Sequence, residues 1–191
     1  VEHCNLRCAN CDHSSPMMPT RSLSPDEILA DLTALANVAR VREIRLTGGE
    51  PLLHPALADC VRAARSSGLS RSVSLVTNGT LLDRMADSVW SNIDGIWVSL
   101  YPDVQYNIDW QGVQAQADRY GAWIWKKTRP TMEENQVCFP HRNSAFVQFV
   151  HDMCVIHDRN AYCTVRNGRV YKCQRAAFMQ SRLEAIGIDD C

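Results

Sequence analysis

The chain has 191 residues, and 46% of them are hydrophobic, which is enough to bury one substantial core. Its 20 Lys and Arg residues nearly balance 21 Asp and Glu residues, so the net charge of -1 gives no electrostatic reason to expect a nucleic acid or an anionic membrane as partner. No apolar run approaches the roughly 18 residues of a membrane-spanning helix, and we expect a cytoplasmic protein.

Helices and strands are predicted to alternate along the first two thirds of the chain. A capping-box pattern at residues 24–27 opens the first helix. The other expected helices cover residues 55–66, 82–90 and 110–120, and the expected strands cover residues 41–46, 72–76, 95–100 and 122–126. This alternation predicts parallel βαβ units, with reactive loops at the carboxyl ends of the strands.

The expected fold is therefore α/β, a partial (β/α)6 TIM-like barrel in residues 1–130. Residues 131–191 are expected to form a small cysteine-rich C-terminal module, because the periodicity weakens there while the cysteines continue. The chain begins without Met and stops abruptly at Cys191, so we expect further segments beyond both ends.

Three of the nine cysteines lie on one short stretch near the start of the chain. Cys4, Cys8 and Cys11 have the spacing C-x3-C-x2-C. Three thiolates on one tight loop can bind three irons of a [4Fe-4S] cluster and leave the fourth iron open to another ligand. The alternative is a structural zinc site completed by His3 or His13.

A second motif, Thr-Gly-Gly-Glu-Pro at residues 47–51, follows the strand expected beside the cysteine loop. Taken with the cysteine spacing and the alternating elements, it resembles the radical S-adenosylmethionine superfamily, over roughly residues 1–127. One position departs from the family pattern, because Asn10 stands where an aromatic residue usually precedes the third cysteine. This departure puts the adenine contact near Asn10 in doubt.

The resemblance implies a [4Fe-4S] cluster and S-adenosylmethionine as cofactors. It implies that Gly48, Gly49 and Pro51 let the backbone approach the ligand, and that Glu50 accepts a hydrogen bond from the methionine ammonium group. Contacts with the nucleoside are expected from two residues at strand ends, Asn78 and Ser99.

A second cysteine group lies in the C-terminal module. Cys154, Cys163 and Cys173 flank an Asn-Gly pair at residues 167–168 that predicts a β-hairpin turn. The segment is similar to the auxiliary-cluster regions of the SPASM and twitch subgroups, which implies a second iron–sulfur cluster. A zinc hairpin or buried thiols are the alternatives.

The fourth ligand of that cluster is open. Cys191 is the preferred candidate. The other candidates are Cys138, or a residue beyond the chain end, or the substrate itself. Two further residues with metal-binding side chains are expected to be structural: His54 in a turn, and Cys60 as a packed thiol on a helix.

These features predict an enzyme that cleaves S-adenosylmethionine to a 5′-deoxyadenosyl radical and removes hydrogen from a small, polar, sugar-like substrate, with oxidation or epimerisation as the outcome. A reductant such as flavodoxin or ferredoxin is the expected protein partner. The polar groups expected near the substrate are His13, Tyr101, Lys126, Lys127 and Arg129. The alternatives are a radical enzyme that modifies ribosomal peptides and a zinc-stabilised, non-catalytic binding module.

Overall fold

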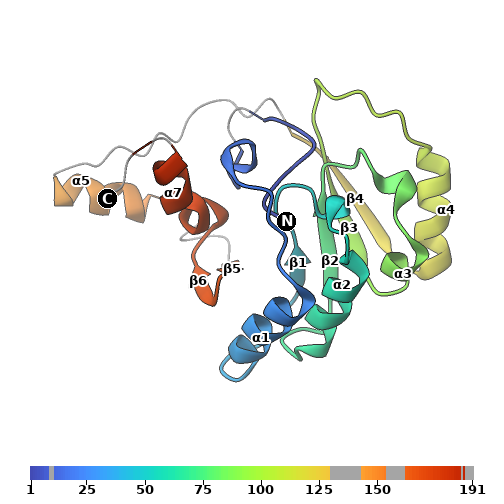
Figure 1. The fold of residues 1–191 in the computed structure, drawn as a ribbon, viewed down its shortest axis with the longest axis horizontal. Helices are drawn as coiled ribbons and strands as arrows, with labels where there is room; N and C mark the ends of the chain where they lie inside the picture. The colour runs from blue at the N-terminus through green and yellow to red at the C-terminus, as the bar shows by residue number, and fades with distance from the viewer. Residues whose placement is uncertain (9–10, 130–142, 154–161, 186, 188–191) are drawn as a thin grey trace.

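The computed structural model describes residues 1–8, 11–129, 143–153, 162–185 and 187. A four-stranded parallel sheet lies at its centre, with the strand order β1-β2-β3-β4 (Figure 1). The strands are β1 (Ile44–Leu46), β2 (Val73–Thr77), β3 (Gly95–Leu100) and β4 (Trp123–Thr128). The predicted parallel α/β class is confirmed, and the sheet formed by the described residues does not close into a barrel.

Four helices connect and cover the strands: α1 (Pro25–Ala36), α2 (Leu57–Ser66), α3 (Asp87–Trp90) and α4 (Trp110–Tyr120). Helix α1 begins with the predicted capping box, in which Ser24 and Glu27 bond each other's backbone N–H groups. Apolar side chains of all four helices join those of β1, β2 and β3 in one core, which includes Leu32, Val61 and Ile96. Burial of this continuous apolar surface is the main force that holds the sheet and its helices together.

The structure corrects one predicted element. Residues 82–90 do not form a single helix, because Met85 and Ala86 are extended between a 3-10 turn at Leu82–Arg84 and helix α3. Two more 3-10 turns, Ser15–Met17 and Pro51–Leu53, flank the cysteine loop and the glycine motif respectively. No helix in the described part of the chain is long and apolar enough to cross a membrane.

The C-terminal region contains α5 (Ser144–Asp152), β5 (Thr164–Arg166), β6 (Arg169–Tyr171) and α7 (Gln174–Ala185). Strands β5 and β6 pair antiparallel, as predicted from the turn at residues 167–168, where both residues have positive φ. Helix α7 was not predicted. Its Ala177 and Phe178 form a second, small apolar cluster with Met18 of the N-terminal region.

Candidate cofactor site

The N-terminal segment that carries the cysteines lies against the turn after β1. The Gly49 N–H donates to the Val1 carbonyl at 2.9 Å, and the Glu50 N–H donates to the His3 carbonyl at 3.1 Å. A Cβ atom on Gly48 would overlap the Val1 carbonyl, and one on Gly49 would overlap the His3 carbonyl. The two glycines are thus required for a close approach between two backbone segments, whereas the sequence led us to expect a close approach to the ligand.

The Glu50 side chain lies in the interior. It is fully buried, and its carboxylate accepts from the Leu52 N–H at 3.0 Å, the Thr77 hydroxyl at 2.7 Å and the Asn78 N–H at 2.8 Å. Burial raises the pKa of this carboxyl, although the three hydrogen bonds act in the opposite direction. The carboxylate thus joins the turn after β1 to the end of β2. Contact with a methionine ammonium group stays a prediction.

Asn78, directly after β2, holds the first half of the cysteine loop. Its Nδ2 donates to Asn5 Oδ1 at 2.8 Å and lies 3.7 Å from Cys4 Sγ. Thr80 extends the contact, because its hydroxyl donates to Asn78 Oδ1 and accepts from Asn5 Nδ2. A nucleoside contact by Asn78 stays a prediction, while the structure shows that this residue positions the loop.

The three cysteines of the loop are partly exposed free thiols. Burial raises the pKa of the Cys4 and Cys8 thiols, so binding a metal there must displace protons. Within the described residues, no three His, Cys, Asp or Glu side chains are close enough to share one metal ion. The thiolates of a [4Fe-4S] cluster bind different irons and lie farther apart than the ligands of a single ion.

An open pocket of about 140 Å³ lies beside two of these cysteines. Its lining residues are Arg7, Cys8, Cys11, Ser14, Pro16, Met17 and Arg182. All but Arg182 come from the N-terminal region, whereas Arg182 comes from α7. The thiols that open into this space are the chemically appropriate donors for an iron–sulfur cluster, so the residues present fit that group.

Three of the other candidate residues gather at the carboxyl ends of β3 and β4. Arg129 Nε donates to the hydroxyl of the buried Ser99 at 3.4 Å. Tyr101 is half-buried, and burial together with the nearby thiol of Cys8 raises its pKa to about 12. Tyr101 therefore keeps its proton at neutral pH and can donate a hydrogen bond to a bound molecule.

His13 packs edge-on against Phe178 of α7, with ring centroids 5.4 Å apart. Burial lowers its pKa to about 4, so the ring is neutral at pH 7. Its Nε2 is buried and has no hydrogen-bond partner among the described residues. Lys126 lies over the Trp110 ring at 3.9 Å, and Lys127 is exposed on β4.

The two residues expected to be structural have structural contacts. His54 Nδ1 accepts from the Ala56 N–H at 3.0 Å, and its Nε2 lies 2.7 Å from the Leu23 carbonyl oxygen. Cys60 is buried in α2, and burial raises its pKa to about 11. The turn contact of His54 and the burial of Cys60 agree with the structural parts predicted for them.

The described cysteines of the C-terminal module lie at the open end of the hairpin. Cys163 directly precedes β5, Cys173 follows β6, and the register pairs Thr164 with Tyr171. Cys154, Cys191 and Cys138 lie outside the described residues.

A loop with three cysteines, held at the carboxyl edge of a parallel sheet, is typical of a metal-binding protein of the α/β class. Among known protein families, the sequence profile of the Radical SAM superfamily matches residues 1–106. The chain belongs to that superfamily, and its cofactors are a [4Fe-4S] cluster and S-adenosylmethionine. This membership favours the enzyme over the zinc-stabilised binding module.

Similar proteins include the GTP 3′,8-cyclase of Chlorobaculum tepidum, 42% identical over 98 residues that cover 51% of this chain and 29% of that protein. The GTP 3′,8-cyclase of Microcystis aeruginosa is 32% identical over 140 residues, covering 63% of this chain and 42% of that protein. The chain thus spans less than half the length of these curated relatives. Among solved structures, BtrN in complex with AdoMet and 2-DOIA has a TM-score of 0.46 and 18% identity, covering 67% of this chain and 53% of that one.

Proposed function

We propose that this chain is the core of an enzyme that cleaves S-adenosylmethionine reductively and removes a hydrogen atom from a small polar substrate. The observation that carries the proposal is the placement of the cysteine loop. Gly48 and Gly49 have no Cβ atoms and so leave room for the backbone that precedes the loop. Asn78 holds the first half of the loop at the carboxyl edge of the sheet. This edge is where parallel α/β folds place their reactive groups.

Each group of residues has a part in this proposal. Cys4, Cys8 and Cys11 would hold the cluster, which would supply the electron that splits S-adenosylmethionine into methionine and a 5′-deoxyadenosyl radical. The protonated hydroxyl of Tyr101 and the guanidinium group of Arg129 orient polar groups of the substrate. The neutral His13 ring packs against Phe178 and so joins the end of the cysteine loop to α7.

The relatives' names favour GTP as the first substrate to test, in place of a free sugar. Sugar nucleotides and aminoglycosides are the second group, because oxidation or epimerisation at a carbinol carbon also begins with removal of hydrogen. The exposed Arg129 and the pocket residue Arg182 are suited to a phosphate or carboxylate group on such molecules.

The test follows deuterium from the substrate into 5′-deoxyadenosine by mass spectrometry, under anaerobic conditions with a reductant. A bond formed at the ribose 3′ carbon requires loss of the hydrogen on that carbon, so GTP deuterated there should transfer its label. Transfer from a labelled sugar nucleotide or aminoglycoside would select the second group. Transfer from a labelled peptide alone would contradict the small-molecule proposal.

The proposal includes a second cluster, as the likeness to the SPASM and twitch subgroups implies. The hairpin supports it by placing Cys163 and Cys173 at the same end of two paired strands. Cys154 and Cys191 are the other proposed ligands.

When Cys4, Cys8 and Cys11 are all replaced by Ala, we expect about four irons to remain per chain. These irons belong to the second cluster, because the C-terminal ligands are unchanged. Metal analysis after anaerobic reconstitution measures this. The matched variant replaces Cys163 and Cys173 and should also retain about four irons, now at the N-terminal loop. One zinc per chain and no iron in the first variant would contradict a second cluster.

A reductant of low potential, such as flavodoxin or ferredoxin, is the proposed electron donor, and a reducing cytoplasm is the proposed location. Both suit an iron–sulfur enzyme whose cysteines must stay reduced for metal binding.

A further inference from the structure

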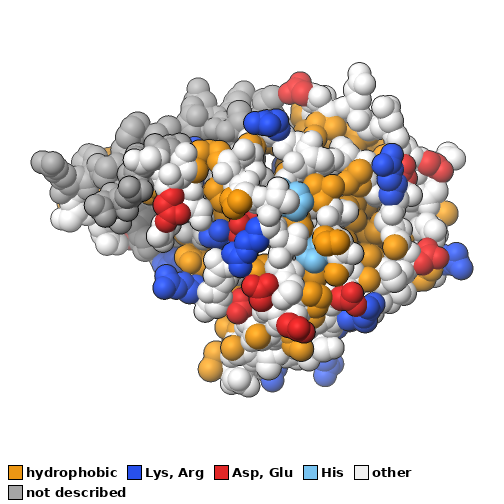
Figure 2. Space-filling model, viewed as in Figure 1, with side chains coloured by type: hydrophobic (Ala, Val, Ile, Leu, Met, Phe, Trp, Pro, Cys, Tyr) orange, Lys and Arg blue, Asp and Glu red, His pale blue; other side chains and the backbone are white. Residues whose placement is uncertain are grey.

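The C-terminal hairpin and helix α7 meet the N-terminal segment on the face shown in Figure 2. Basic and acidic side chains lie close together near the middle of this face, over the region where β5 and β6 approach the N-terminal segment in Figure 1. No local sequence pattern predicts that charged groups pair here, because these regions stand at opposite ends of the chain.

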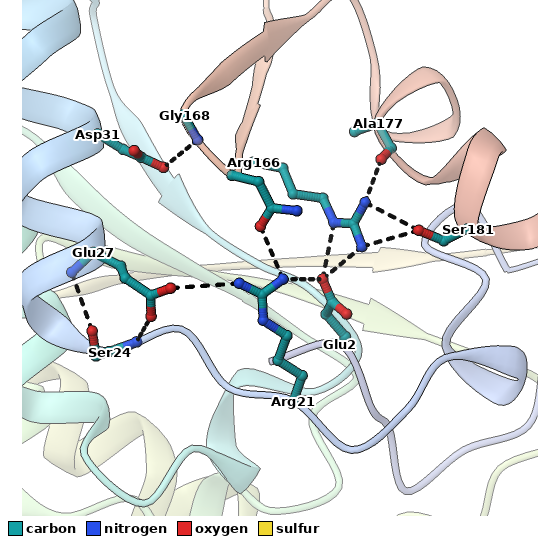
Figure 3. Close-up of polar contacts among 10 residues, drawn as sticks. Glu2, Arg21, Ser24, Glu27, Asp31, Arg166, Gly168, Ala177 and Ser181 are labelled. Carbon is teal, nitrogen blue, oxygen red and sulfur yellow. Dashed lines mark hydrogen bonds and ion pairs between the residues drawn. The ribbon is translucent and has the colours of Figure 1, made fainter.

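The central pair joins Glu2 to Arg166. Glu2 lies two residues before the first cysteine, and Arg166 ends β5 (Figure 3). Arg166 Nε and Nη2 lie 2.9 Å and 2.8 Å from the same oxygen, Glu2 Oε1. The side chains are only 13% and 10% exposed, so this ion pair is shielded from solvent far more than an ordinary surface pair.

Arg166 also binds helix α7. Its Nη1 donates to the Ala177 carbonyl at 2.8 Å and to the Ser181 hydroxyl at 3.3 Å. Its guanidinium group lies over the Phe178 ring, 4.4 Å from the centroid. One planar cation thus joins the hairpin, α7 and the N-terminal segment, a set of contacts that the fixed fork of arginine allows.

A second ion pair lies on the other side of the cysteine loop. Asp12 directly follows Cys11, and its Oδ1 lies 2.5 Å from Nε of Arg175 in the first turn of α7. The edge-on contact between His13 and Phe178 lies next to this pair. The C-terminal region therefore supplies one arginine to each side of the loop that carries the cysteines.

We propose that the hairpin β5–β6 and helix α7 form a clamp on the cysteine loop, in which Arg166 and Arg175 are positioning residues for the cluster. The inference deepens the proposed function and rests on it. The two ion pairs fix Glu2 and Asp12, and the three cysteines lie between these two residues in the sequence. The same helix places Arg182 in the pocket beside Cys8 and Cys11, so docking of α7 also completes the pocket wall.

The clamp explains why Glu2 and Arg166 lie buried at this position. Removing Arg166 leaves the Glu2 carboxylate, which is 10% exposed, with only the longer contact to Arg21 at 3.8 Å, which is unfavourable for a shielded charge. The segment relieves this by moving, and the cysteines move with it. Loss of either arginine should therefore alter how the cluster is held before it alters the distant sheet.

The test compares anaerobically reconstituted wild-type protein with Arg166→Ala and Arg175→Ala. The readouts are iron per chain, the rate of iron loss to a chelator and the midpoint potential from a titration followed by electron paramagnetic resonance. The iron at the N-terminal loop is measured in a background with Cys163 and Cys173 replaced by Ser. We expect iron loss to be about tenfold faster in Arg166→Ala and faster by a smaller factor in Arg175→Ala, whose ion pair is more exposed, with a shifted potential in both.

Two further variants keep the test decisive if a single replacement fails to fold. Arg166→Lys retains the charge without the planar fork and should restore part of the iron retention. The exchange of Glu2→Arg with Arg166→Glu restores opposite charges and should retain iron better than either single change. The control is Arg62→Ala, which breaks an exposed ion pair with Asp59 on α2, and it should leave the rate of iron loss unchanged.

The outcomes separate the two proposals. If the wild type takes up no iron at the N-terminal loop, the proposed function fails, and the clamp fails with it. If the wild type takes up iron, while both arginine variants match Arg62→Ala in iron loss and potential, the clamp alone is overturned. A lower unfolding temperature without a change in either cluster readout also overturns it, because it shows a merely structural role.

Discussion

Replacing Cys4, Cys8 and Cys11 together by Ala should reduce production of 5′-deoxyadenosine to background. Among the described residues, these are the three cysteines that share one loop, and that loop lies against the glycine turn after β1. A second cluster at Cys163 and Cys173 is not expected to compensate, because these residues lie on a separate hairpin.

The measurement is mass spectrometry of 5′-deoxyadenosine after anaerobic incubation with S-adenosylmethionine and dithionite. Cys60→Ala is the matched control, since it removes a buried thiol from α2 at a small cost in packing. The control should retain cleavage. Undiminished cleavage by the triple variant would show that these cysteines do not hold the reactive cluster.

Replacing Glu50 by Ala should lower both the stability of the fold and the affinity for S-adenosylmethionine. The change leaves three buried donors without an acceptor, from Leu52, Thr77 and Asn78, at a cost of roughly 2–4 kcal/mol in the free energy of unfolding. Because Asn78 also holds Asn5 of the cysteine loop, the disturbance should reach the cofactor site and weaken binding about tenfold.

Glu43→Ala is a matched control for this change. Glu43 accepts from the Ser74 hydroxyl at 2.5 Å, Trp97 Nε1 at 3.0 Å and Arg45 Nε at 2.7 Å, but it directly precedes β1 at the opposite end of the strand. It should lower the unfolding temperature without changing the affinity for S-adenosylmethionine, measured by calorimetry well below that temperature. Equal affinities in the two variants would limit Glu50 to a structural part.

Local patterns predicted much of the fold. Strand β3 has the predicted bounds, Gly95–Leu100, because a short apolar run between turn residues has few alternatives. The hairpin at residues 167–168 follows from an Asn-Gly pair that accepts positive φ. The break at Met85 and Ala86 was missed, since neither residue opposes a helix by its own preference, and the surrounding core determines where α3 begins.

In the candidate site, too, some features could be predicted from local sequence and others could not. The cysteine spacing and the glycine motif are visible in the sequence because their members are close together along the chain. Two of the three partners of Glu50, Thr77 and Asn78, lie at the end of the next strand of the sheet, and Glu2 and Arg166 are 164 residues apart. No local pattern reports such contacts, so Asn5, Glu2, Arg166 and Arg182 could be found only once the chain was folded.

The distance along the chain between these partners sets an order of events during folding. The cysteine loop is synthesised before its partners, because its backbone contacts require Gly49 and Glu50, its side-chain contact requires Asn78, and its ion pair requires Arg166. Contacts between residues far apart in sequence form late, because closing large loops costs entropy before any contact compensates for it. The segment that carries the cysteines is therefore synthesised before its partners but becomes ordered only with them, and we expect iron to enter after Arg166 has been synthesised.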